Sequence, residues 1–196
     1  MIRLIAQPWW VNLLILVPVA AYLYWRSNRV PLTLLQLISS GVFAAAFGFL
    51  EAVVVVYLRA ATGLLPGYQG TLADIIRLSG QFNMEPQRVA AQFPQSLLAL
   101  EVFREAATIL MLLSVAVLSS RKPKVGAAVF LWAFAIWDIV YYAALWATVR
   151  WPLSLNDPDV LFLIPVPWFS PVWFPLLVSG LAVATVLFTR DIPEKH

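Results

Sequence analysis

The stretch "LLQLISSGVFAAAFGFLEAVVVVYL", residues 34–58, decides the class of this protein, because it is apolar along nearly its whole length. Its single charged residue is Glu51. About 20 consecutive, mostly apolar residues cross the hydrocarbon core of a bilayer as one helix. Ala44, Gly48 and Ala52 recur at every fourth position, so one face of this helix is narrow enough for a second helix to approach closely. The stretch therefore predicts a membrane-spanning helix that packs against a neighbour.

Four other apolar stretches extend this prediction to the whole chain. The sequence is 62% apolar and 12% charged, whereas a soluble domain is about half apolar and about a quarter charged. We expect an all-α integral membrane protein that forms a single polytopic domain over residues 1–196. This domain is a bundle of about five transmembrane helices. They are predicted at residues 8–25, 34–58, 96–119, 125–149 and 172–189. Pro18 should kink the first helix. A secretory signal is the alternative for residues 8–25, but the aromatic residues at both ends favour a retained span.

Two segments between the predicted helices are of a different kind. Residues 60–95 are rich in Gly and Pro and hold two short amphipathic stretches that could lie on the membrane surface. Residues 150–171, "RWPLSLNDPDVLFLIPVPWFSP", hold five prolines among bulky apolar residues. Such a run cannot form a regular helix, and it predicts a Pro-rich re-entrant or interfacial segment packed on protein. Within it, "NDPD" predicts a turn, with a metal-ligand role for Asp157 or Asp159 as the alternative.

Basic residues in the loops predict the orientation of the chain. Short loops rich in Lys and Arg stay on the cytoplasmic side of a membrane. With five spans, one side receives seven basic residues, namely Arg26, Arg29, Arg121, Lys122, Lys124, Arg190 and Lys195. We therefore expect a multi-pass protein of the cell membrane with its N-terminus outside and its C-terminus in the cytoplasm. Residues 60–95 and 150–171 then lie outside.

The composition also excludes several kinds of chemistry. Cys is absent, and the one His is His196, the last residue. These counts exclude disulfides, thiolate metal sites, haem held by axial His and a Ser-His-Asp triad within this chain. Any metal would be a divalent cation held by oxygen, and Glu51, Glu105 and Asp138 are the speculative ligands. The net charge of +3 is small and spread out, so no nucleic-acid partner is expected.

Charged residues inside the predicted spans mark a candidate site. The stretch "LEVFREAATILML", residues 100–112, carries Glu101, Arg104 and Glu105 where the chain enters the third span. With Thr108 they are spaced i, i+3, i+4 and i+7, which places them on one helical stripe. At about 1.5 Å of rise per residue, other polar groups fall at a similar depth in the outer half of their spans. The predicted pocket opens outward and is formed by Glu51, Glu101, Arg104, Glu105, Asp138, Tyr141 and Tyr142.

The charges of this cluster do not balance. Four carboxyl groups face one guanidinium, and uncompensated charge is costly away from water. Protonation of some carboxylates, a bound cation, a basic group of a partner or substrate, or contact of Glu101 with water would each relieve the excess. An internal staple, in which Arg104 pairs with one or two Glu residues and orders the bundle, is the structural alternative. For Tyr141 and Tyr142 the structural alternative is the aromatic belt at the membrane surface; as a site residue, one Tyr would donate a hydrogen bond to the cluster.

Three functions fit these residues. The first is a transport-type membrane protein whose pocket binds a proton, a cation or a small polar solute. The second is a non-catalytic accessory subunit of a larger membrane complex, with the small-residue faces of spans two and five as docking surfaces for other subunits or for a second copy. The third is an outer-leaflet enzyme that uses acid–base carboxylates or an oxygen-ligated metal. The sequence leaves open whether the protein is an enzyme.

Overall fold

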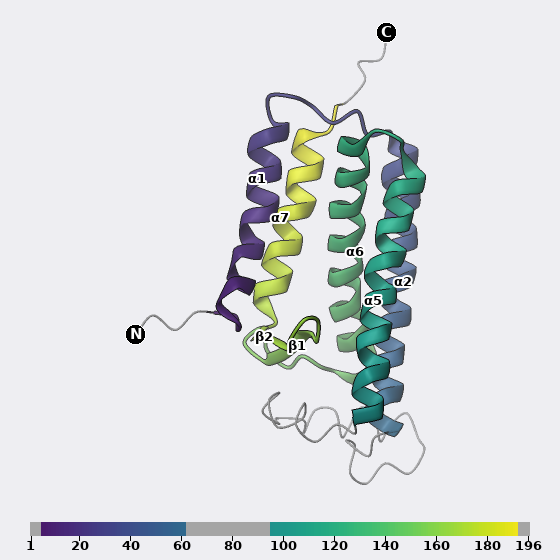
Figure 1. Cartoon of the computed structure of the whole chain (residues 1–196), viewed down its shortest axis with the longest axis vertical. Helices are drawn as coiled ribbons and strands as arrows, with labels where there is room; N and C mark the ends of the chain where they lie inside the picture. The colour runs from purple at the N-terminus through teal and green to yellow at the C-terminus, as the bar shows by residue number, and fades with distance from the viewer. Residues whose placement is uncertain (1–4, 62–94, 192–196) are drawn as a thin grey trace.

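The computed structural model describes residues 5–61 and 95–191, which form a mostly helical bundle with a small β-hairpin at one end (Figure 1). The two amphipathic stretches predicted within residues 60–95 lie outside the described residues. The elements are a 3₁₀ helix η1 (Trp9–Ile15), α1 (Leu16–Trp25), α2 (Leu34–Ala61), α5 (Gln95–Ser119), α6 (Pro123–Val149), β1 (Pro158–Phe162), β2 (Trp168–Pro171) and α7 (Trp173–Thr189).

All five predicted spans are helical, within a few residues of the expected bounds. Three of the described helices are long and apolar enough to cross a membrane, over Leu34–Tyr57, Leu98–Ser119 and Pro123–Val149. The other two, Trp9–Trp25 and Trp173–Thr189, are apolar but shorter. In the first of these, a 3₁₀ segment precedes the α-helix, and the change comes at Leu16, just before the predicted kink residue Pro18.

The ends of α6 show why the chain turns where it does. The helix begins at Pro123, whose fixed φ suits the first helical position and whose missing N–H would have no partner there. It ends at Arg150, which adopts the left-handed conformation with φ of 57° and donates its N–H to the Trp146 carbonyl at 3.1 Å. Pro152 follows closely, so the helix cannot continue.

Helix α6 lies at the centre of the bundle, where it packs against α2, α5 and α7, while α1 packs against α7. The α2 contact uses the predicted small-residue face. Ala44, Gly48 and Ala52 are all buried, and a Cβ added at Gly48 would lie only 2.5 Å from the Trp137 carbonyl oxygen. This face is an internal interface, which corrects its assignment as a docking surface for another subunit.

The small-residue face of the fifth predicted span, formed by Gly180 and Ala184, packs differently. A Cβ added at Gly180 of α7 would meet no atom of the described residues within 4 Å, and this residue is exposed. Ala184, one turn further, is half-buried. Small residues allow close helix contact wherever a partner is present, but within the described chain no helix uses Gly180 in this way.

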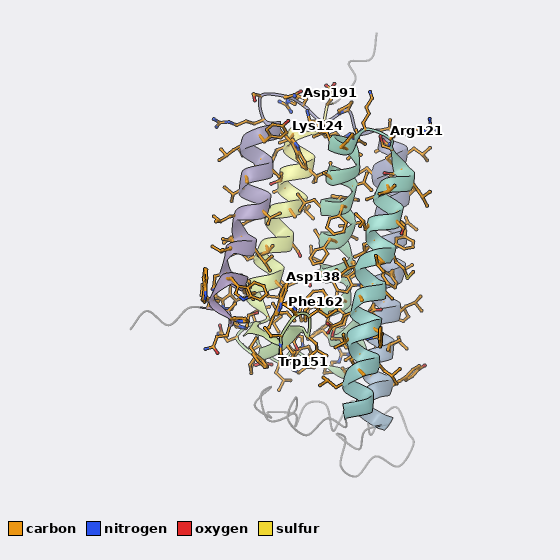
Figure 2. All side chains as sticks on the ribbon, in the orientation of Figure 1. Arg121, Lys124, Asp138, Trp151, Phe162 and Asp191 are labelled. Atoms are coloured by element: carbon orange, nitrogen blue, oxygen red, sulfur yellow. The ribbon has the colours of Figure 1, made fainter. Side chains whose placement is uncertain are left out.

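The loops expected on the cytoplasmic side lie together at one end of the bundle (Figure 1, top). The Lys124 ammonium donates to the carbonyls of Asn28 and Arg29. The Arg29 guanidinium donates to the Phe188 carbonyl at 2.8 Å, and Arg190 donates to Leu32 at 2.9 Å. Figure 2 shows Arg121, Lys124 and Asp191 at this end and Trp151 near the opposite end. The basic loops are therefore segregated as predicted, while their side of a membrane stays a prediction.

The Pro-rich segment contains regular structure that the sequence analysis did not predict. Strands β1 and β2 pair antiparallel, with Asp159 opposite Ser170 and Val160 opposite Phe169. Gln7 extends the pairing, because its backbone exchanges hydrogen bonds of 2.8 and 2.7 Å with Phe169. The fold class all-α is thus wrong in this detail. The prolines exclude a helix but are tolerated in a short two-stranded sheet, where each strand has an edge that needs no N–H.

The predicted turn at "NDPD" is confirmed only in part. Leu155 and Asn156 form the turn, but Pro158 and Asp159 already belong to β1. The Asp157 carboxylate accepts hydrogen bonds from the backbone N–H groups of Leu153 at 2.7 Å and Ser154 at 3.1 Å. This is the local role that favours Asp in turns, and it fixes the path from α6 into the hairpin.

Candidate functional site

A cavity of about 880 Å³ lies within the bundle. Its walls come from α5 on one side, α1 and α7 on the other and α6 between them, with the hairpin at one end. Figure 2 shows Asp138 of α6 and Phe162 of β1 close together in this region, far from the end that carries the basic loops. All seven predicted site residues line this one cavity: Glu51, Glu101, Arg104, Glu105, Asp138, Tyr141 and Tyr142.

Arg104 joins two helices through its guanidinium. It forms ion pairs with Glu51 of α2 and with Glu101 one turn earlier in α5, the latter at 2.8 Å. The Thr108 hydroxyl donates to the other Glu51 oxygen at 3.1 Å. The predicted stripe on α5 is confirmed by these contacts. The staple alternative also describes this part of the site correctly, since one guanidinium pairs with two carboxylates and ties α5 to α2.

Glu105 does not take part in that staple. Its side chain is buried, and its carboxylate accepts the backbone N–H of Leu163 at 2.7 Å. Leu163 directly follows β1. A hydrogen bond from a backbone N–H to a charged acceptor contributes about 1.5–3 kcal/mol, so Glu105 holds the tip of the hairpin against α5.

Asp138 and Tyr142 have different partners from the expected ones. The Asp138 carboxylate accepts a hydrogen bond from the Ser179 hydroxyl of α7 at 2.8 Å. The Tyr142 hydroxyl donates to Asp159 of β1 at 2.8 Å. Tyr142 therefore bonds to a carboxylate outside the predicted cluster, and a hydrogen bond from a Tyr to one of the predicted site residues stays a prediction. Tyr141 contacts the cluster through its ring, which lies 5.2 Å from that of Tyr142 between centroids.

Sequence reasoning missed two members of the site. Ser179 is a polar residue in the middle of an apolar span. This position could have indicated a site residue, because serine hydroxyls in membrane helices form hydrogen bonds with neighbouring helices. Asp159 was considered only as a metal ligand in a turn. Its position opposite Tyr142 depends on the hairpin, which the sequence analysis did not foresee. Both residues line the cavity.

Negative charge exceeds positive charge around the cavity. Among the described residues, its lining holds five carboxyl groups, those of Glu51, Glu101, Glu105, Asp138 and Asp159, and one guanidinium, that of Arg104. Arg104 already pairs with two of the five. The hydrogen bonds to Glu105 and Asp138 described above come from an amide and a serine, which carry no positive charge. The site can therefore attract a cation.

The cavity is polar at one end and apolar at the other. On α6, the lining residues run from Tyr142 and Asp138 at the hairpin end to Phe134, Leu131 and Phe130. The helix rises about 1.5 Å per residue, so this series extends over roughly 18 Å. Neighbouring helices add Pro18, Leu110 and Ala182 to the lining. The polar part of the α6 lining therefore ends at Asp138, and the lining beyond it is apolar.

Two buried indole nitrogens near the charged end have no hydrogen-bond acceptor among the described residues. They are the Nε1 atoms of Trp137 and Trp168. Both residues line the cavity. A buried donor without a partner costs about 1–3 kcal/mol, and an acceptor oxygen on a bound molecule could relieve this cost.

The arrangement lends no support to the speculative metal site. In the described part of the chain, no three or more His, Cys, Asp or Glu side chains gather in a way that could hold a metal ion. Glu51 belongs to the Arg104 staple, whereas Glu105 and Asp138 bind separate partners. An oxygen-ligated cation at Glu51, Glu105 and Asp138 stays a prediction.

Comparisons with protein-family models, with curated proteins and with solved structures find no match to this chain.

Proposed function

We propose that this chain is a transport-type membrane protein that binds a cation or a small cationic solute in its intramembrane cavity. The single observation that carries the proposal is that Glu105 and Asp138, two buried carboxyl groups that line the cavity, accept hydrogen bonds only from neutral donors of the described residues. Charge without compensation is costly inside a membrane and marks functional residues there. A bound cation would provide the compensation that the described side chains do not.

The proposal separates two roles within the cluster. Arg104, Glu51 and Glu101 form a structural staple, in which the charges are paired. Glu105 and Asp138 come from α5 and α6 and accept hydrogen bonds only from neutral donors among the contacts described above. These two carboxyl groups are the proposed cation-binding residues, and Ser179 orients Asp138.

The proposal includes a location in the cell membrane with the hairpin outside. Its support is the segregation of the basic loops to the end of the bundle opposite the hairpin (Figure 1). Since basic loops stay in the cytoplasm, the charged end of the cavity would lie in the outer half of the membrane. The accessory-subunit and enzyme alternatives gain no specific observation from the contacts of the described residues.

A thermal-shift titration of the purified full chain in neutral detergent tests the proposal. A ligand that binds only the folded state stabilises it by about 2.7 kcal/mol at one hundred times its Kd. We expect propylammonium chloride to raise the unfolding temperature above the value in sodium chloride of equal ionic strength.

Asp138→Asn should remove this difference, whereas Asp191→Asn, an exposed carboxylate at the other end, should keep it. Equal unfolding temperatures in the two salts for the unsubstituted protein would refute cation binding. So would the same ammonium-specific shift in Asp138→Asn, because the carboxylate would then be irrelevant.

A further inference from the structure

We propose that the ligand of this cavity is an amphiphile with an ammonium head and a long apolar tail, which enters sideways from the lipid between α1 and α5. This inference rests on the proposed function, since it assigns the chemical class of the bound cation. It concerns the part of the cavity that a small cation leaves unused.

The size of the cavity is the first argument. Its volume of about 880 Å³ lies near the upper end of the roughly 300–1,000 Å³ typical of sites for drug-sized molecules. A small cation bound at Asp138 and Glu105 would occupy only the hairpin end. The remaining wall is apolar and includes Phe130, Leu131 and Ala182. An apolar tail is the group that matches such a wall.

The order of side chains along α6 is the second argument. From the hairpin end inward, the lining presents Tyr142 and Asp138, then Trp137, then Phe134 and Phe130. A molecule placed along this helix would have its charged group at the carboxylates and its tail at the phenyl rings. Trp137 lies between the two parts, and its unpartnered indole N–H suits an oxygen acceptor at the junction of head and tail.

The third argument is the position of two residues at the rim of the cavity, Val17 and Leu110. Val17 of α1 and Leu110 of α5 both line the cavity, yet they are 52% and 61% exposed. They belong to helices on opposite sides of the cavity, with α6 and α7 between them (Figure 1). Both are apolar and lie in the middle of a helical stretch, Val17 within Trp9–Trp25 and Leu110 within Gln95–Ser119. The surface around them would therefore face acyl chains in a membrane and not water. A tail already dissolved in the bilayer could pass between them while its head slides toward Asp138.

The charge of the head decides between this ligand and ordinary lipid that merely fills an apolar cavity. A neutral or anionic amphiphile would gain the same apolar contacts as a cationic one. It would not offset the charge of Glu105 and Asp138, and an anionic head would add to their repulsion. The proposal therefore requires that affinity depend on head charge at constant tail length.

The test is native mass spectrometry of the full chain in neutral detergent, titrated with dodecylamine, dodecanol, dodecanoate and propylamine at neutral pH. Dodecylamine should bind at least about tenfold more tightly than dodecanol, a ratio that corresponds to about 1.4 kcal/mol. Dodecanoate should bind more weakly than either. Asp138→Asn should reduce the affinity for dodecylamine by about the same factor, and Asp191→Asn should leave it unchanged.

The tail is tested by filling the apolar end. Ala182→Phe places a ring where Ala182 now lines the cavity, so it should weaken dodecylamine at least about tenfold and leave propylamine unchanged. Gly180→Leu, on the same helix but toward open space, is the matched control. If Ala182→Phe does not fold, Leu110→Trp at the exposed rim takes its place, with the same expected result.

Each outcome bears on a different part of the reasoning. Equal binding of dodecylamine and dodecanol would overturn the ammonium head and show adventitious filling by lipid. If propylamine binds as tightly as dodecylamine, the tail assignment falls while cation binding stands. If no amine binds at all, the proposed function fails together with the inference.

Discussion

Substitution of Arg104 by Gln should destabilise the fold strongly, and a second substitution should restore much of the loss. In the native protein the Arg104 guanidinium pairs with Glu51, whose side chain is only 8% exposed, and with Glu101, whose side chain is 13% exposed. Removal of one partner from a buried ion pair costs about 3–5 kcal/mol, because the remaining charge is left buried and unpaired. Arg104 itself is 24% exposed, so we expect the lower end of this range, about 3 kcal/mol.

The double variant Glu51→Gln with Arg104→Gln removes both charges of the inter-helix pair. Two neutral amides can still form a hydrogen bond between α2 and α5, and the cluster loses one of its carboxylates. We expect the double variant to be more stable than Arg104→Gln alone by about 1–2 kcal/mol, within the range of coupling measured for residues in direct contact.

The assay is thermal unfolding of the full chain in one neutral detergent, followed by intrinsic tryptophan fluorescence. For a chain of this size, 1 kcal/mol shifts the unfolding temperature by about 2–4 °C, so Arg104→Gln should lower it by about 6–12 °C. Arg121→Gln, an exposed residue at the basic end, is the control and should change stability by less than about 0.5 kcal/mol. A shift for Arg104→Gln no larger than that of the control, or a double variant less stable than the single one, would refute the staple.

Three further predictions follow from the contacts of the bundle. Gly48→Leu should prevent native packing of α2 on α6, because its Cβ would lie 2.5 Å from a backbone carbonyl oxygen, whereas Gly180→Leu should fold. Size-exclusion chromatography and circular dichroism would show the difference. A well-folded Gly48→Leu protein would contradict this helix contact. Glu105→Ala should speed hydrogen exchange at the Leu163 amide. Glu105→Gln should speed it much less, because its side-chain oxygen can still accept that hydrogen bond. Equal exchange rates in both variants would contradict the role of Glu105 in holding the hairpin against α5. A reporter fused after residue 124 should read cytoplasmic, and one inserted at residues 154–156 should read external; the reverse pattern would overturn the proposed orientation.

The sequence by itself determined the helices and much of the charged cluster. Long apolar runs bounded by charges and prolines specify helices whatever the neighbours are, because backbone groups in an apolar environment must bond within their own segment. The i, i+3, i+4 spacing of Glu101, Arg104 and Glu105 places them on one face without reference to the fold. The basic residues at alternate helix ends likewise predicted which loops lie together.

Only the tertiary structure decided how these parts are used. The small face of α2 at Gly48 could have met a helix of any chain, and the pairing with α6 becomes known only when the helices are placed. The hairpin depends on contacts of residues 158–171 with each other and with Gln7, which no local pattern in a Pro-rich run specifies. For the same reason the sequence did not predict the hydrogen bond between Tyr142 and Asp159 or that between Ser179 and Asp138. Partners on different elements are fixed by packing, since a sequence period shows which face a residue occupies but not what lies opposite that face.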